Sequence, residues 1–195
     1  MSVSAHDVAR ELRGRLGADL GQTKLQKLLF LVQAWHVTWR GEALFHEEIQ
    51  AYPNGPVVHE FRADEMHANR QRPAPAEVPD GGVIDLVVSN YGHMTKAALI
   101  IETHTFSCWR NARIEAGDDL TWLQADPLAE GWQDGNGIPS LPINLEAMVP
   151  DIRATPTWAA HENVVERHRA AMDRFRAPLE QNYELQARIE EAIGL

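Results

Sequence analysis

Cysteine is almost absent from this sequence, and so are long hydrophobic runs. Cys108 is the single cysteine among 195 residues, which excludes an internal disulfide framework and suits a reducing compartment. No apolar run approaches the roughly 18 residues that a membrane-spanning helix needs. The opening segment MSVSAHDVARELRGRL lacks the apolar core, about 7 to 15 residues long, of a signal peptide. We therefore expect a soluble, cytoplasmic protein.

Positive charge is also scarce. The net charge is −10, and residues 114–151 contain no lysine or arginine. This acidic segment holds eight carboxylates: Glu115, Asp118, Asp119, Asp126, Glu130, Asp134, Glu146 and Asp151. Such a segment repels a phosphate backbone and attracts a basic protein surface, although a solvated loop without any partner is an equally simple explanation. The few clustered arginines between 62 and 72 are interleaved with carboxylates, so the sequence disfavours nucleic-acid binding.

Motifs for phosphate or metal chemistry are missing as well. The chain has neither a Gly-x-Gly-x-x-Gly loop nor a Walker lysine. His93, His104 and Cys108 are the nearest approach to a zinc or cysteine–histidine site. With no second cysteine and no closely spaced ligand pairs elsewhere, we predict no metal, no cofactor and no enzymatic activity. The thiol of Cys108 is then an incidental, partly buried group at a helix entry.

Helical periodicity dominates what is present. Ser4 with Asp7 predicts the start of a first helix, and Thr23 with Gln26 forms a second capping box. The second helix, which Gly41 ends, is apolar around most of its circumference. A helix of that kind is buried on several sides, so we predict that it lies at the centre of the fold.

Shorter elements follow this helix. Residues 44–52 predict a strand or hairpin arm, and the turn at 53–56 places Pro56 at the first position of a new helix. Residues 69–82 are rich in proline and predict an exposed connector. Residues 83–88 fit a strand by composition and a helix by spacing. Further helices are expected from Ser107 and over 144–153.

The chain ends in a predicted helical tail. Thr155-Pro156 starts it, and nine positions from Val165 to Ile193 then follow a 3-4 spacing, although three of them are polar, which would make a free-standing coiled coil weak. Pro178 is expected to kink or split the helix near Ala177. The predicted fold is therefore mainly α (α+β): a compact helical domain over 1–153 with a small β hairpin, and a C-terminal helical extension over 154–195. The extension is also a candidate site for self-association into a homo-oligomer.

Several stretches together resemble one known family. They are Lys24–Leu29, Gln33–His36, Leu44–Phe45 with Glu48–Ile49, Asn54–Val58, Tyr91–Thr95, Glu102–His104 and Trp109–Arg113. This series resembles the Panacea domain, the module shared by a large group of bacterial and phage antitoxins of the SocA-like kind. The similarity is spread over residues 5 to 150, and it favours a helix at 83–88. Pro53-Asn54 and Cys108 depart from the family pattern.

The resemblance implies a function. It implies an antitoxin, carried by a bacterium or prophage, that neutralises a cognate protein toxin by direct binding. An adaptor that delivers the toxin to an ATP-dependent protease is the alternative, and a DNA-binding regulator is a second one. The residues that the resemblance assigns to the shared framework are Gln26, Gln33, His36, Gly55, Pro56, Tyr91, Gly92, Thr103, His104 and Trp109. We expect their polar groups, including the buried His36, to be structural.

Partner-binding residues are predicted from charge and aromatic content. Aromatic anchors among polar residues are typical of protein interfaces, although these rings could equally pack over the domain. The candidates lie in the acidic segment and the tail: Asp118, Asp119, Trp122, Trp132, Trp158 and Phe175. Trp35, Trp39 and Trp109 occupy helical positions and are predicted to belong to the core.

Overall fold

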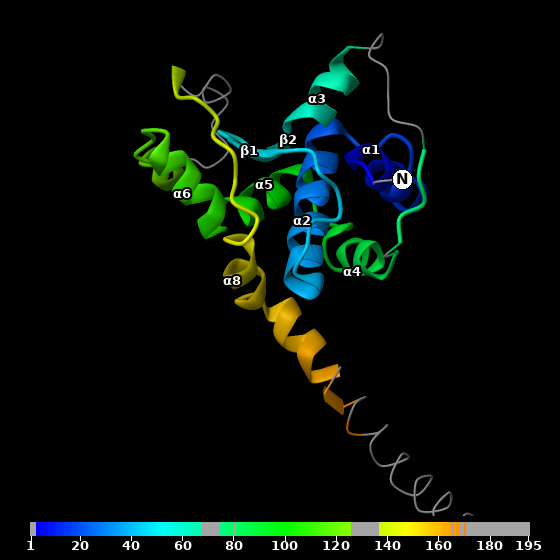
Figure 1. Cartoon of the computed structure of the whole chain (residues 1–195). Coiled ribbons are helices and arrows are strands. Elements are labelled where there is room, and N and C mark those ends of the chain that lie inside the picture. Colours follow the sequence, from blue (N-terminus) through cyan, green and yellow to red (C-terminus); the bar gives the residue numbers. More distant parts are fainter. Residues whose placement is uncertain are drawn as a thin grey trace, which may run out of the picture. The chain divides into compact units, whose positions relative to one another are not determined.

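The computed structural model describes residues 3–67, 75–79, 81–125, 137–164, 166–167 and 170 (Figure 1). The chain divides into two compact units, Met1–Arg153 and Ala154–Leu195, and each is described by itself. The first unit is mainly helical with one two-stranded antiparallel sheet. The predicted fold class is therefore confirmed.

The first helix begins where the sequence predicts it. Helix α1 spans Ala5–Leu16, and Ser4 caps it in a complete capping box with Asp7. The Asp7 carboxylate accepts hydrogen bonds from the backbone N and the hydroxyl of Ser4. Local side-chain chemistry thus sets this boundary.

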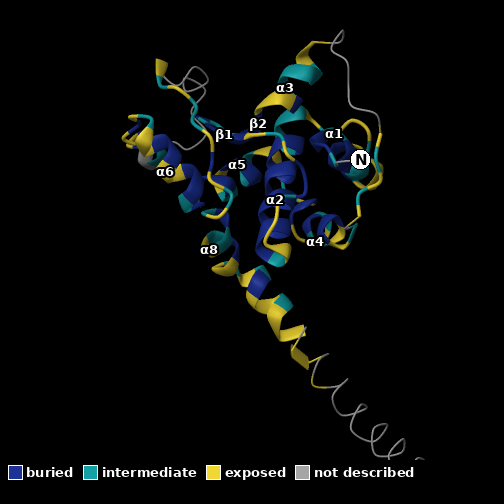
Figure 2. Ribbon diagram, viewed as in Figure 1, coloured by how far each residue is buried: buried dark blue, intermediate teal, exposed yellow. Residues whose placement is uncertain are grey.

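Helix α2, Gln22–Arg40, is the centre of the first unit. It packs against α1, α4, α5, α8 and strand β2, and Figure 2 shows it buried over most of its length. The predicted capping box at Thr23 is wrong: the cap residue is Gly21, two residues earlier, and it provides no side-chain cap. The side-chain amide oxygen of Gln26 accepts a hydrogen bond from Val58 N instead, at 2.8 Å. A tertiary partner has replaced the local one.

The segment after α2 forms a hairpin. Strands β1, Ile49–Tyr52, and β2, Gly55–Val58, pair antiparallel across Pro53-Asn54. The predicted helix start at Pro56 is wrong, because Pro56 pairs with Ala51 in the sheet. Helix α3, His59–Met66, begins three residues later. Residues 141–143 lie along the other edge of β1, where Leu141 O accepts from Ala51 N at 2.8 Å.

The remaining helices complete the first unit. They are α4 (Gly81–Tyr91), α5 (Lys96–His104), α6 (Ser107–Glu115), α7 (Trp122–Ala125) and α8 (Met148–Arg153). Residues 83–88 are therefore helical, as the resemblance favoured, and Thr95 caps α5 through Ala98 N. The helix predicted over 144–153 begins only at Met148, because Asn144 closes a turn by accepting from Glu146 N. Half of the predicted connector at 69–82 lies outside the described residues; 75–79 belong to no helix or strand, whereas Gly81 and Gly82 already belong to α4.

In the second unit, residues 156–164 are helical. The hydroxyl of Thr155 accepts a hydrogen bond from Trp158 N at 3.1 Å, which is the capping role expected at this helix start. Most of the predicted tail, including Pro178, lies outside the described residues. Within the described part of the chain, no helix has the length and apolar character required to cross a bilayer.

Candidate functional site

Two glutamines of α2 hold the hairpin segment against the helix. Gln33 accepts hydrogen bonds from the N–H groups of Leu44 and Phe45, at 3.0 and 3.3 Å, and donates to Phe45 O at 2.9 Å. Gln26, two helical turns earlier, accepts from Val58 N. Because the two side chains satisfy both ends of one backbone segment, they fix the position of the hairpin relative to α2.

Lys27 lies beside Gln26 and is almost completely buried, with 1% of its surface exposed. Its ammonium donates to the carbonyl of Pro56 at 3.0 Å, and none of the described carboxylates forms an ion pair with it. Burial lowers the pKa of Lys27 from 10.5 to about 7. Such a shift is expected for an ammonium that has left water without gaining a counter-ion.

Gly55 makes room for this lysine. Its φ of +89° lies in the region that favours glycine. A Cβ at this position would lie 2.8 Å from the Thr103 hydroxyl and 3.0 Å from the Lys27 ammonium. The Thr103 hydroxyl itself donates within α5 to the carbonyls of Leu99 and Ile100. Gly55, Pro56 and Thr103, three predicted framework residues, thus surround one buried cation.

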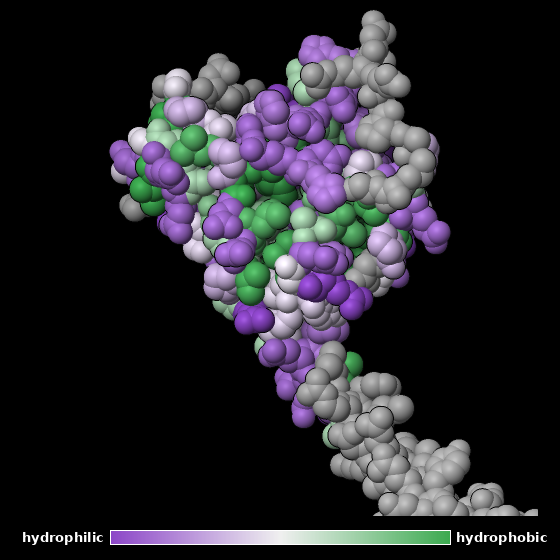
Figure 3. Space-filling model, viewed as in Figure 1, coloured by the Kyte–Doolittle hydropathy of each residue, from purple (hydrophilic) through white to green (hydrophobic). Residues whose placement is uncertain are grey.

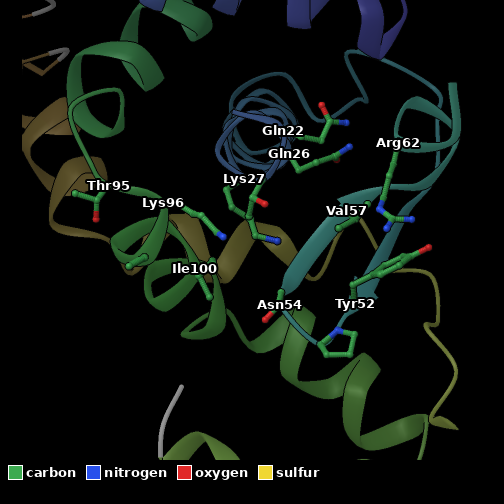
Figure 4. Close-up of a pocket in the computed structure, with 13 residues that line it drawn as sticks. Gln22, Gln26, Lys27, Tyr52, Asn54, Val57, Arg62, Thr95, Lys96 and Ile100 are labelled. Carbon is green, nitrogen blue, oxygen red and sulfur yellow. The ribbon is translucent and has the colours of Figure 1, made fainter. Parts of the chain in front are cut away.

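A cavity of about 580 Å³ opens above Lys27 (Figure 4). Its walls come from the start of α2, the hairpin turn, α3 and the start of α5. The lining residues are Gln22, Thr23, Gln26, Lys27, Tyr52, Pro53, Asn54, Val57, Arg62, Thr95, Lys96, Ala97 and Ile100. In Figure 4 the side-chain nitrogens of Lys27 and Lys96 lie close to the centre of the view. None of these lining residues is acidic, so every formal charge around the cavity is positive.

Three aromatic rings, one each from α5, α6 and α7, pack together. His104 stacks on Trp109 with ring centroids 4.2 Å apart, and Trp122 meets both rings edge-on. Trp109 also donates from Nε1 to Tyr52 O at 2.8 Å, which ties α6 to β1. Burial and the positive charge of Lys27 lower the pKa of His104 to about 3. His104 is therefore a neutral packing residue rather than a base at neutral pH.

Arg113 and Asp118 form a buried ion pair next to this stack. The two residues are 0% and 2% exposed, and Asp118 Oδ2 accepts from Nε and Nη2 of Arg113 at 2.9 and 2.7 Å. The other oxygen of Asp118 accepts from Leu120 N and Trp122 Nε1. Asp118 and Trp122, both predicted as partner contacts, are thus held inside the fold. A direct contact of either with a partner stays a prediction.

Other residues of the acidic segment are exposed, at the end of α6 and just after it. Ile114 is 56% exposed, and Figure 3 shows hydrophobic residues on the surface around this helix. Glu115 is exposed beside it, and Asp119 is also exposed, accepting hydrogen bonds from the N and hydroxyl of Thr121. These bonds lower the pKa of Asp119, so its carboxylate is anionic at neutral pH. We call Ile114, Glu115 and Asp119 the α6-end surface.

Cys108 does not have the surroundings of a nucleophile. It is 3% exposed, and its backbone N donates to Asp151 at 3.0 Å. Burial and the adjacent Asp151 carboxylate raise the pKa of its thiol well above its ordinary value, so the reactive thiolate is not formed at neutral pH. In the described part of the chain, no three His, Cys, Asp or Glu side chains come close enough to hold a metal ion.

The other predicted residues are placed as follows. His36 is buried, and its Nδ1 lies 2.9 Å from the carbonyl of Glu42, as expected for a hydrogen-bonded core histidine. Tyr91 is 4% exposed, and Gly92 O accepts from the Lys24 ammonium. Trp158 belongs to the second unit, where it is 9% exposed. Trp132 and Phe175 lie outside the described residues.

Sequence reasoning missed the two buried cations. Both lie in stretches that resemble the family, Lys24–Leu29 and Trp109–Arg113, and neither was predicted to be buried. One signal for Lys27 was available: it precedes Phe30, Leu31 and Ala34 at helical spacing, and all three are buried. A lysine in line with three apolar positions of a central helix is expected to be buried with them.

Comparison with known proteins finds one family whose model matches part of this chain. Residues 25–80 match the model of the family described as antitoxin SocA-like, Panacea domain. Neither the curated proteins nor the solved structures contain a match. The matched stretch contains Gln26, Lys27, Gln33 and the whole hairpin. Of these, Gln26, Lys27 and the hairpin residues Tyr52, Pro53, Asn54 and Val57 line the cavity. The resemblance seen in the sequence is thereby confirmed over residues 25–80, which are similar to the Panacea domain of SocA-like antitoxins.

Proposed function

We propose that this protein is the antitoxin of a toxin–antitoxin pair and that it neutralises a protein toxin by binding it directly. The match of residues 25–80 to the SocA-like antitoxin family carries the proposal. In this proposal residues 1–153 are the antitoxin domain and 154–195 an extension, and the pair acts in the cytoplasm of a bacterium or a phage-infected cell.

The α6-end surface is the proposed point of contact. It combines an exposed isoleucine with two carboxylates, Glu115 and Asp119, and lies in a segment without any lysine or arginine. A toxin that acts on nucleic acid or nucleotides presents a basic surface, which these carboxylates would attract. Desolvation of Ile114 would supply affinity, whereas the carboxylates would mainly speed the encounter.

The function is tested by expressing the reading frame next to this gene under an inducible promoter. We expect that frame to arrest growth alone and growth to return when the 195-residue chain is co-expressed. The two purified proteins should elute together from a size-exclusion column. If neither neighbouring frame is toxic, or toxicity persists with the antitoxin present, the antitoxin proposal is wrong.

The mechanism is tested in the same cells by following the toxin on immunoblots. Direct binding predicts that the toxin persists in a complex after rescue. If the toxin instead disappears, and reappears when an ATP-dependent protease is deleted, the chain acts as a proteolytic adaptor.

The contact surface is tested with Ile114→Arg. We expect about 10-fold weaker toxin binding, because a charge replaces an apolar contact in the interface. Ile101→Arg is the matched control, since Ile101 is also exposed, at 45%, but lies on α5. Equal effects of the two substitutions, or none from Ile114→Arg, would place the interface elsewhere.

A further inference from the structure

Two residues that line the cavity above Lys27 have buried hydrogen-bond donors without an acceptor. The side-chain nitrogens of Gln22 and Gln26 are buried without a hydrogen-bond partner, and Gln26 as a whole is 2% exposed. An unsatisfied buried amide is costly, so native structures normally pair it. Two such amides one helical turn apart, both lining the same cavity, indicate a missing acceptor.

The charges around the cavity indicate the nature of that acceptor. Lys27, Arg62 and Lys96 come from three different helices, and the residues lining the cavity include no carboxylate. Lys27 is the deepest of the three, and the Pro56 carbonyl uses only one of its three donor hydrogens. Its pKa of about 7 is that of a buried ammonium without a counter-ion.

Two helix starts add to this positive field. Gln22 and Thr23 lie in the first turn of α2, and Lys96 and Ala97 lie in the first turn of α5; all four line the cavity. The first N–H groups of a helix lack internal acceptors and carry partial positive charge. At α2 the cap residue Gly21 provides no side-chain acceptor either. Convergent helix starts with nearby lysines are a recurrent arrangement for binding phosphate groups.

The size and walls of the cavity exclude a bare ion as a good fit. A volume of about 580 Å³ lies within the range of sites for small organic ligands, roughly 300 to 1,000 Å³. Val57, Ile100 and Pro53 provide apolar wall, and the Arg62 guanidinium lies 5.5 Å from the centroid of the Tyr52 ring. The cavity therefore offers a cationic floor and rim together with an apolar side.

We propose that this cavity binds a small phosphorylated organic molecule, with its phosphate held between Lys27, Lys96 and the starts of α2 and α5. The Gln26 amide nitrogen is buried without a partner and Gln26 lines the cavity, so a movement of this side chain towards the cavity would let it donate to a phosphate oxygen. The organic part of the ligand would lie against Val57 and Ile100. This site is separate from the α6-end surface and does not depend on the antitoxin function.

Binding is tested by calorimetric titration of the full chain, in a phosphate-free buffer, with ribose 5-phosphate, inorganic phosphate and ribose. We expect ribose 5-phosphate to bind more tightly than inorganic phosphate, and ribose not at all. On 15N-labelled protein, the side-chain amide signals of Gln22 and Gln26 should shift during the titration with ribose 5-phosphate. If neither phosphate probe binds at concentrations up to about 10 mM, weaker than any affinity of functional use, the proposal is wrong.

Two variants locate the site. Lys96→Met changes an exposed residue and should weaken ribose 5-phosphate binding about 3-fold, as expected for a solvent-exposed charge. Lys27→Met should weaken it about 10-fold or more, because it removes a buried charged donor. Lys24→Met is the matched control: Lys24 lies on the same helix, bonds to Gly92 O and does not line the cavity.

The variants also separate this proposal from that of the antitoxin. Phosphate-probe binding that is equal in the wild type, Lys96→Met and Lys27→Met would show that the anion binds elsewhere, and the proposal would fail. If Lys96→Met impairs toxin neutralisation while the wild type binds neither phosphate probe, the cavity is a toxin contact and the small-ligand proposal fails while the antitoxin proposal stands. Loss of probe binding with intact neutralisation supports two independent sites.

Discussion

Replacement of Lys27 by methionine should make the protein more stable at low pH and remove a pH dependence of its stability. Burial lowers the pKa of Lys27 from 10.5 to about 7, so the unfolded chain holds this proton more tightly than the folded one. Between these two values the unfolded state binds more protons, and stability therefore rises with pH. The cost of the buried charge is complete below pH 7 and disappears as pH rises towards 10.5.

The magnitude follows from the size of the shift. About 3.5 pKa units at roughly 1.4 kcal/mol each give a full cost on the order of 5 kcal/mol below pH 7. Of this, about 3 kcal/mol should be lost between pH 6 and pH 9.5. Methionine has a similar shape and no charge, so Lys27→Met keeps the packing and removes the free-energy cost of the buried charge. The variant also loses the hydrogen bond to Pro56 O.

Urea unfolding of both proteins at several pH values between 6 and 9.5 measures the effect. The informative quantity is the difference in unfolding free energy between variant and wild type, because all other titrating groups are common to both. We expect this difference to favour the variant most at pH 6 and to shrink by about 3 kcal/mol by pH 9.5. Lys24→Met controls for the loss of a lysine from α2. A difference that stays constant within about 1 kcal/mol over this range would refute an uncompensated buried charge at Lys27.

Three further substitutions test other parts of the structure. Asp118→Ala should cost about 3 to 5 kcal/mol in urea unfolding, because Arg113 would stay buried without its partner, and the double variant Arg113→Met/Asp118→Leu should recover part of that loss. Gly55→Ala should cost about 2 kcal/mol or more, since alanine is strained at this positive φ and its methyl would meet the Thr103 hydroxyl. Cys108→Ser should leave toxin neutralisation intact, and Cys108 of the native wild type should react with a thiol reagent only as fast as the chain opens; rapid stoichiometric labelling would contradict its burial.

Local signals allowed much of the helical fold to be predicted from the sequence. Ser4 and Thr95 accept hydrogen bonds from N–H groups in the first turns of their helices, and Gly41 ends α2 in a left-handed conformation. These features depend on residues three or four positions apart, which a sequence displays directly. The apolar circumference of α2 likewise predicted its central place, because a helix without a polar face must be covered on several sides.

The hairpin and the buried cations depend on contacts that the sequence does not display. Gly55-Pro56 has the composition of a helix start, but β2 is fixed by pairing with β1 and by Gln26, which is 32 residues before Val58. Arg113 is accommodated by Asp118 and by the carbonyls of Ala51 and Pro139. Partners so distant along the chain become neighbours only after folding, so periodicity cannot reveal them.

The two buried cations show why the cavity, rather than the ion pair, suggests a ligand. Arg113 is surrounded by a carboxylate and two carbonyls, so its charge is compensated within the fold. Lys27 has one carbonyl, and the cavity that it lines contains two further cations and no carboxylate. One fold thus contains both a satisfied and an unsatisfied buried charge, and the unsatisfied one faces a cavity large enough for an organic molecule. An uncompensated charge lowers stability, and in our proposal the phosphate of the bound ligand supplies the missing partner and offsets that cost.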